Sequence, residues 1–266
     1  MTIAAAPCSD AEQRLIARAL RQGPSVTAPV PHQADYSGQY ALSGPAKVRD
    51  ARITPIRGDL ADIALAGKLF APHYVVPMER MVTAAFSPLR KTPQDDAEQT
   101  SELLAGERFM VLDIAGAWAW GYCQHDCYNG YIALDALGDP VGEAPVASPR
   151  DPVEAALARL GTPYVWGARG GVGIDCSGLV QTAFAHAGIA LPRDSDQQEA
   201  CGQAVQTAQR GDLVFFPGHV TIATGADQVV HASQGASGIG GAVTVEPLAE
   251  VVARKGEPTH IRRVLP

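Results

Sequence analysis

The chain has 266 residues, of which 46% are hydrophobic and 18% charged, and its formal net charge is −7. This length allows one large domain or two to three small ones, and the composition is that of a globular protein with a packed core. The acidic balance and the lack of a basic stripe argue against nucleic acid as a partner. No window approaches the roughly 20 apolar residues that a membrane-spanning helix needs, so no membrane partner is expected.

Five cysteines stand at irregular spacing, and an odd count does not suggest the disulfide framework of a secreted protein: Cys8, Cys123, Cys127, Cys176 and Cys201. The amino terminus carries a short apolar patch without basic residues before it, and acidic residues follow early. We therefore expect no signal peptide, a reducing compartment and a cytoplasmic location. Cys123 and Cys127 have Cys-x3-Cys spacing and no second cysteine pair, which favours a structural role over a metal site.

The first fifty residues predict a short helix and an extended arm. Ser9 and Glu12 have the spacing of a capping box, and apolar residues follow on one helical face, so a helix is expected over residues 9–22. The stretch after it is rich in Pro, Gly, Ser and Ala and has no periodicity, which is the composition of a linker or arm. A second short helix is predicted over residues 61–69.

From about residue 74 to 138 the pattern changes to short alternating apolar runs separated by turn residues, as in a small all-β barrel. The run GERFMVLDIAGAWAWGYCQHDCYNGYIALDALG resembles bacterial SH3-like domains, with a strand, a turn, a tryptophan-bearing strand and a Gly-Tyr strand. We place an SH3-like domain at residues 51–140, after the helix and arm of residues 1–50. A linker is expected over residues 141–150.

The remaining segment, residues 151–266, begins with helix signals and ends with strand signals. Asp151 has the position of a helix cap, with Pro152 first in the helix and Glu154 in its first turn. A glycine-rich loop, a second helix (CSGLVQTAFAHAG) and runs of strand composition follow. Helices followed by an antiparallel sheet indicate an α+β domain.

Cys176 stands where the glycine-rich loop becomes the second helix. Free backbone N–H groups and the helix dipole at that end favour a thiolate, although a single cysteine before an apolar helix is also commonly just buried. A thiolate nucleophile needs a histidine that accepts and returns a proton. His186 lies ten residues along the same helix, about 15 Å away, which excludes it.

The two remaining candidates, His219 and His231, fall in consecutive predicted strands. Pairing of Thr224 with Gln228 would leave a three-residue loop. In that register His219 stands opposite Ser233, and His231 is its diagonal neighbour on the same face, about 7 to 8 Å away. A two-residue turn would put the two histidines on opposite faces, so we predict an odd-length loop or a bulge. His219 would then contact the sulfur and His231 would orient His219.

From residue 151 to about residue 260 the chain resembles the NlpC-type cell-wall peptidases, which are papain-like cysteine enzymes. The string GTPYVWGARGGVGIDCSGLVQ matches their nucleophile motif, and LPRDSDQQ, RGDLVFFPGHV and VVHAS follow in the family's order. The resemblance implies a papain-like domain, helices on an antiparallel sheet, over residues 151–266. It implies Cys176 as nucleophile, His219 as base and His231 as orienting residue, with no cofactor and no metal.

The resemblance also implies roles for neighbouring residues. Tyr164 matches the family tyrosine near the oxyanion and the substrate, while Asp175 and Ser177 match residues that hold the acyl-side peptide. The alternatives are loop packing for Tyr164, a helix cap for Asp175 and a first-turn position for Ser177. A further family block that lines the groove is matched by Arg193, Asp194, Ser195 and Gln198.

An SH3-like front domain together with GIDCSGLVQ and DSDQQ resembles the YkfC-like dipeptidyl peptidases. Those enzymes cut γ-D-glutamyl to diamino acid bonds in free muropeptides, and their SH3-like domain recognises the free amine of the terminal L-alanine. An ammonium group is held by a counter-charge or an aromatic face. Tyr128 is our candidate for the aromatic wall, and Asp95, Asp96 or Glu98 for the acid, with barrel packing and a solvated loop as the alternatives.

The expected partner is thus a peptidoglycan-derived peptide, and the expected role is muropeptide recycling. Two other functions fit the same residues. The chain would be a non-catalytic adaptor that binds wall peptides, or a related cysteine amidase or acyltransferase.

Overall fold

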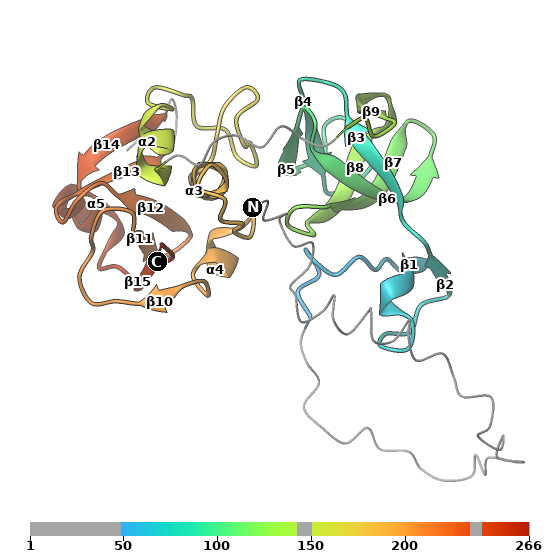
Figure 1. Ribbon diagram of the computed structural model, residues 1–266, viewed down its shortest axis with the longest axis horizontal. Coiled ribbons are helices and arrows are strands. Elements are labelled where there is room, and N and C mark those ends of the chain that lie inside the picture. The colour runs from blue at the N-terminus through green and yellow to red at the C-terminus, as the bar shows by residue number, and fades with distance from the viewer. Residues whose placement is uncertain (1–48, 143–150, 235–240, 266) are drawn as a thin grey trace, which may run out of the picture.

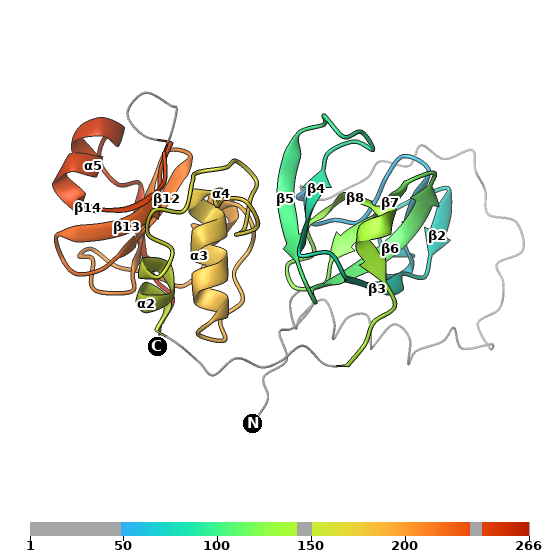
Figure 2. The same cartoon turned by 90° about the horizontal axis from the view of Figure 1, so that it is seen from above.

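The computed structural model describes residues 49–142, 151–234 and 241–265, which form two bodies side by side (Figures 1 and 2). The helix predicted over residues 9–22, the arm that follows it and most of the linker at 141–150 lie outside the described residues. Within these ranges, no helix is both long and apolar enough to cross a membrane.

The segment before the first body is not the helix predicted over residues 61–69. It contains β1 (Leu60–Asp62), a single 3-10 turn η1 (Ile63–Leu65) and β2 (His73–Val75), and β1 pairs with β2 in parallel. The Asp62 side chain caps η1 by accepting the N–H of Ala64 at 2.7 Å. Gly67, with φ 76°, then turns the chain away from a helical path. The apolar periodicity is used instead to bury Ala61 and Leu65 against Ala71.

The first body is one seven-stranded sheet, antiparallel throughout. Its strands are β3 (Met78–Val82), β4 (Phe86–Arg90), β5 (Gln99–Leu104), β6 (Arg108–Ala115), β7 (Trp118–Cys123), β8 (Asn129–Ala133) and β9 (Leu137–Gly138), with the 3-10 turn η2 (Leu134–Ala136) before β9. They lie in the order β5-β4-β8-β7-β6-β3-β9. Alternating residues such as Phe109 and Val111 point into a shared apolar core, as the period-two pattern predicts.

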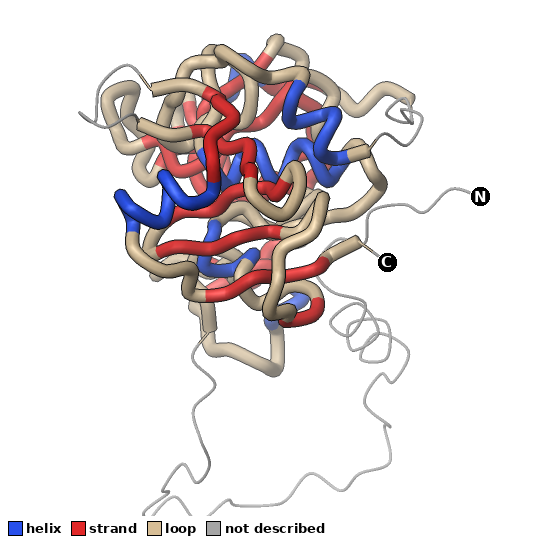
Figure 3. The backbone as a smooth tube through the Cα atoms, turned by 90° about the vertical axis from the view of Figure 1, so that its left-hand side faces the viewer, coloured by secondary structure: helices blue, strands red, loops and turns tan. Residues whose placement is uncertain are grey.

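The second body contains a six-stranded antiparallel sheet in the order β10-β15-β11-β12-β13-β14, whose strands run side by side in Figure 3. These strands are β10 (Gln203–Ala204), β11 (Leu213–Phe216), β12 (His219–Ala223), β13 (Gln228–Ala232), β14 (Val243–Pro247) and β15 (His260–Arg263). The helices are α2 (Pro152–Leu157), α3 (Cys176–Ala185), α4 (Ser195–Gln198) and α5 (Leu248–Lys255).

Two apolar cores hold this second body together. One joins α2 and α3 to β11, β12 and β13, and it includes Val153, Phe184 and Val220. The other joins α5 to β11, β12 and β13 through Val251, Val214 and Val229. The predicted cap of α2 is confirmed, since Asp151 accepts the N–H groups of Val153 and Glu154 at 2.7 and 3.3 Å.

Candidate active site

Cys176 is the first residue of α3, as its position before the apolar helix predicts. Asp175 is the N-cap and accepts the N–H of Gly178 at 2.7 Å. Cys176 is 6% exposed, and it packs in one apolar core with Val220 of β12. The thiol therefore meets β12 at the residue directly after His219.

The resting form of Cys176 differs from the thiolate predicted from the helix dipole. Burial raises the pKa of the Cys176 thiol to about 11, and the negative charge of Asp175 adds to the rise. The N–H groups of Val220 and Ser177 and the charge of Arg193 act in the opposite direction but are weaker. Loss of water thus outweighs the helix terminus, and the free protein holds a neutral thiol at pH 7.

The predicted register of the histidine hairpin is confirmed. Thr224 donates its N–H to the carbonyl of Gln228 at 2.9 Å, and Ile222 pairs with Val230, which leaves a three-residue loop over 225–227. His219 and His231 consequently share one face of the sheet. His219 Nε2 lies 2.7 Å from His231 Nδ1.

A third polar group, Glu246 on β14, continues this row, and sequence reasoning missed it. Its Oε1 lies 3.6 Å from Nε2 of His231, and its carboxylate also forms an ion pair with Arg254 on α5. The register pairs His231 with Thr244, so Glu246 is the diagonal neighbour of His231. The signal lies only in the β13 to β14 pairing, which no motif predicts.

Both histidines are neutral at pH 7. Burial lowers the pKa of His219 to about 2, and the neighbouring His231 and the cations of α5 add to the effect. The pKa of His231 is also lowered by burial, although Glu246 opposes the shift. Within the described ranges, the sulfur of Cys176 makes no hydrogen bond to either imidazole. The free site thus holds a neutral thiol at the start of α3 and a neutral, hydrogen-bonded imidazole pair on β12 and β13.

Asp175 and Ser177 are held from behind by Arg193, whose side chain is 1% exposed. Arg193 donates to Asp175 Oδ2 at 2.6 Å and to Ser177 Oγ at 2.9 Å, and it reaches Ser101 Oγ on β5 at 3.1 Å. Asp175 also accepts the N–H of Gly167 at 2.8 Å. Its oxygens are thereby bonded to protein groups, which is the helix-cap alternative for this residue.

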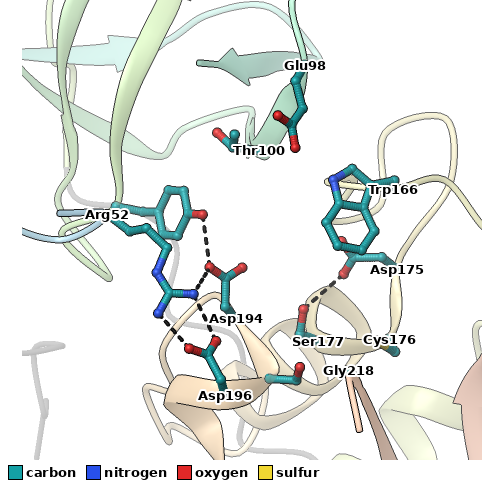
Figure 4. Close-up of a pocket in the computed structure, with 12 residues that line it drawn as sticks. Arg52, Glu98, Thr100, Trp166, Asp175, Cys176, Ser177, Asp194, Asp196 and Gly218 are labelled. Carbon is teal, nitrogen blue, oxygen red and sulfur yellow. Dashed lines mark hydrogen bonds and ion pairs between the residues drawn. The ribbon is translucent and has the colours of Figure 1, made fainter. Parts of the chain in front are cut away.

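A pocket in front of Cys176 lies between the two bodies (Figure 4). Its lining includes residues that the sequence singled out: Tyr128, Asp175, Cys176, Ser177, Asp194 and Ser195. Glu98 is the member of the predicted acid group that lines it. The lining also includes Arg52, Trp166 and Asp196, which sequence reasoning missed.

Other predicted site residues lie behind or beside the pocket. Tyr164 is half-buried, and burial, followed by the charge of the nearby Cys176, raises its pKa. Gln198 is buried, and its amide donates to the carbonyls of Ser177 and Pro192 at 3.0 and 2.8 Å. Tyr164 and Gln198 therefore lie outside the pocket lining. Tyr164 packs against the core that contains Cys176, and Gln198 holds the backbone of the next residue, Ser177.

The nucleophile loop is braced by the first body. Glu102 on β5 is 1% exposed, and its Oε2 accepts the backbone N–H groups of Arg169 and Gly171, both at 2.9 Å. The Arg169 side chain returns a hydrogen bond to the Glu102 carbonyl at 2.8 Å and pairs with Glu107 at 2.7 Å. The GARGG stretch after Trp166 is therefore an interdomain contact.

Cys127 departs from the expectations for the cysteines. It is disulfide-bonded and has the left-handed φ of 62°, whereas Cys123, Cys176 and Cys201 are free. A disulfide is unusual in a reducing compartment, so this cysteine counts against the reducing compartment expected from the cysteine spacing. In the described part of the chain, no group of three or more His, Cys, Asp or Glu side chains is arranged to hold a metal.

Comparison with known proteins agrees with this geometry. The sequence profile of the NlpC/P60 family matches residues 161–255, and that of the bacterial dipeptidyl-peptidase SH3 domain matches residues 89–137. A probable endopeptidase of Corynebacterium glutamicum (strain R) is 41% identical over 155 residues, covering 50% of this chain and 74% of that protein. The chain belongs to the NlpC/P60 family. In this NlpC/P60 chain the matched segment holds Cys176 and both histidines.

Two further relatives of this NlpC/P60 protein are matched over part of their length. Dipeptidyl-peptidase 6 of Lysinibacillus sphaericus is 41% identical over 101 residues, 37% of this chain and 36% of that protein. Peptidoglycan endopeptidase RipB of Mycobacterium tuberculosis (strain CDC 1551 / Oshkosh) is 38% identical over 165 residues, 48% of this chain and 64% of that protein. The chain thus spans about a third to two thirds of these relatives. The solved structure of RipB aligns with a TM-score of 0.37 at 36% identity, covering 44% of this chain and 64% of that chain.

Proposed function

We propose that the protein is a cysteine endopeptidase that hydrolyses peptidoglycan-derived peptides. The proposal assigns Cys176 as nucleophile, His219 as general base and His231 as the residue that orients it. The observations that support it are Cys176 at the start of α3 on the pocket, its packing in one core with Val220, the residue after His219, and the buried His219–His231 pair on the same sheet. Membership of a family of cysteine peptidases supports the same assignment.

The proposed catalytic domain has the papain-like arrangement, in which the helix that starts at the nucleophile packs on the antiparallel sheet that carries the base. The apolar core shared by α3, β12 and β13 supports it.

The contacts from Glu246 through His231 to His219 determine which ring nitrogen of His219 carries the proton. A proton on Nε2 of His231 faces the carboxylate of Glu246, which leaves Nδ1 of His231 as an acceptor. His219 then donates from Nε2 across the 2.7 Å contact, and its Nδ1 is free to accept a proton. Protonation of His219 gives an imidazolium cation. The negative charge of Glu246 also stabilises this cation.

The reaction proceeds in two steps. Nδ1 of His219 accepts the thiol proton as the Cys176 sulfur attacks the peptide carbonyl, and the backbone N–H of Cys176 is the proposed donor to the oxyanion. The C–N bond breaks as His219 returns the proton to the leaving amine. Water, deprotonated by His219, then cleaves the thioester, which releases the acid and restores the thiol.

The proposed scissile bond joins the γ-carboxyl of D-glutamate to a diamino acid. Residues of the first body line the pocket, and in this proposal they limit the length of peptide on the acyl side of Cys176. Among them, Tyr128 is buried and donates to Asp194 Oδ2 at 2.9 Å, with Glu98 also in the lining. An aromatic face and carboxylates suit the ammonium group of an amino-terminal L-alanine.

Incubation with L-Ala-γ-D-Glu-diaminopimelate tests this proposal. The wild type should release L-Ala-D-Glu, detected by mass spectrometry, and Cys176→Ala should not. Cys201→Ala is the matched control because Cys201 is a free, half-buried cysteine that does not line the pocket. Binding without cleavage would favour an adaptor, and release of another product would favour a different amidase or acyltransferase.

The muropeptide-recycling role and the cytoplasmic location stay predictions. The disulfide at Cys127 favours an oxidising compartment instead. Fractionation of cells with an antibody against the protein decides between the two compartments.

A further inference from the structure

Arg52 belongs to the segment that precedes the first body, yet its side chain lines the pocket in front of Cys176 (Figure 4). All five N–H donors of a guanidinium are in use there. Nε and one terminal nitrogen donate to Asp50 at 2.9 and 2.7 Å. The remaining donors reach Asp194 Oδ2 at 2.8 Å and Asp196 at 2.8 and 2.7 Å. Arg52 therefore has no spare donor for an anionic group of a substrate.

The charge of this cluster remains negative. Three carboxylates surround one guanidinium, which leaves a formal charge of −2, and Glu98 adds another carboxylate to the same pocket. Such a wall attracts cations and repels anions.

Asp194 is one of the two carboxylates paired with Arg52 that line the pocket. Its Oδ2 accepts from both Arg52 and Tyr128, and its side chain also faces the backbone N–H of Gln197 in the capping box of α4. Burial raises the pKa of Asp194, so a bound cation would compensate for water that this carboxylate has lost. The carboxylate is thus held in place on the pocket wall, where a positively charged ligand can reach it.

The segment that carries Arg52 is fixed to both bodies. Asn129, at the start of β8, donates its side-chain amide to the carbonyls of Ala51 and Thr54 at 2.8 and 3.2 Å. Its backbone N–H donates to the carbonyl of Arg52 at 2.8 Å. On the other side, Gln197 of α4 donates to Asp50 at 2.9 Å. The segment therefore links Tyr128 and its neighbour Asn129 to the helix that begins after Asp194.

We propose that Arg52 is a positioning residue that determines specificity for substrates with a free amino-terminal ammonium group. It holds the Asp194 carboxylate in the pocket wall that the ammonium would face, and it keeps Asp50, Asp194 and Asp196 together. This inference rests on the proposed peptidase function and adds a wall built by the segment before the SH3-like domain. Lysine at this position has three donors and no planar fork, so it replaces only part of the arrangement.

The test compares L-Ala-γ-D-Glu-diaminopimelate with its N-acetylated form. Loss of a charge-assisted hydrogen bond corresponds to about a tenfold change in affinity. Arg52→Ala should raise KM for the free-amine peptide about tenfold with kcat within twofold, and should leave kcat/KM for the acetylated peptide within about twofold of wild type. Arg52→Lys should fall in between. Arg57→Ala is the matched control, because Arg57 pairs with Asp59 and Asp113 outside the pocket.

Equal losses on both peptides would overturn the inference, since Arg52 would then only join the two bodies. A lower KM for the free-amine peptide in Arg52→Ala would also overturn it, because Arg52 would be competing with the substrate. Asp194→Asn keeps the size of the side chain and should show the same selective loss if Arg52→Ala does not fold. A wild type that cleaves neither peptide contradicts the proposed function itself, whereas an active wild type with no selective loss contradicts this inference alone.

Discussion

Cys176 and His219 are both uncharged before substrate arrives. Burial raises the pKa of the thiol to about 11 and lowers that of the imidazole to about 2, so an ion pair in the free protein is unfavourable. The proton moves only when the sulfur attacks, with His219 as general base. The helix terminus at Cys176 predicts a thiolate instead. That prediction failed because a sequence motif does not show how deeply the thiol is buried.

The pH dependence of alkylation tests this resting state. Because the thiolate is the reactive form, labelling of Cys176 by iodoacetamide should rise about tenfold for each pH unit from 7 to 10, with no plateau at acidic pH. Peptide mass spectrometry separates Cys176 from Cys123 and Cys201. A labelling midpoint below pH 7 would show a preformed thiolate and contradict the neutral pair.

Glu246 acts on catalysis through His231. Glu246→Ala removes the carboxylate charge 3.6 Å from His231 Nε2, so the orientation of the imidazole pair and the cation that forms on it are less stabilised, and kcat should fall about tenfold with KM unchanged. Glu246→Gln keeps the size of the side chain and an acceptor oxygen but not the charge, so it should restore only part of the lost kcat. Equal losses in both variants, with an equal drop in Tm, would show a purely structural role.

At the scale of elements, the helix start and the hairpin register were predictable because both depend on short-range rules. Asp175 caps α3 through the adjacent backbone, and loop length fixes which face His231 occupies. The helix predicted over residues 61–69 failed for the opposite reason. Its apolar residues pack on Ala71 and Tyr74 beyond the turn, a contact that local periodicity does not contain.

The length of the loop between β12 and β13 can be changed to test whether His219 and His231 must lie on the same face of the sheet. Deleting Gly225 shortens the loop over 225–227 by one residue, which moves His231 to the other face relative to His219. Peptide hydrolysis should then fall at least about a hundredfold. Inserting two glycines after Gly225 preserves parity and should keep activity within about fivefold of wild type. Full activity in the deletion variant, with folding confirmed by circular dichroism, would contradict the assigned roles of the two histidines.

At the scale of the whole molecule, the pocket is a product of three segments: the stretch around Arg52, the first body and the second body. The sequence motifs predict the nucleophile and both histidines, since these follow one another within a single domain. Arg193 to Ser101 and Arg169 to Glu102 join residues more than 60 positions apart, and no motif encodes such pairs. Arg193 and Gln198 were singled out as groove residues, but their partners and their buried supporting role were not predictable from the sequence.

A substitution at Glu102 tests how much the contact between the two bodies contributes to the stability of the fold. Glu102→Ala leaves the buried N–H of Arg169 and that of Gly171 without an acceptor, so the free energy of unfolding should fall by about 3 kcal/mol. Urea denaturation measures this change. Glu98→Ala is the control, because Glu98 is exposed and should change stability by less than about 0.5 kcal/mol. Similar values for both variants would mean that the brace on the nucleophile loop contributes little.

The central claim is that the peptide bond is cleaved through a thioester on Cys176. Rapid acid quench of the wild type with L-Ala-γ-D-Glu-diaminopimelate, followed by mass spectrometry, should find the Cys176 peptide carrying the L-Ala-D-Glu acyl group. Cleavage of the peptide by Cys176→Ala at the wild-type rate, with no adduct on Cys176 in the wild type, would contradict the account.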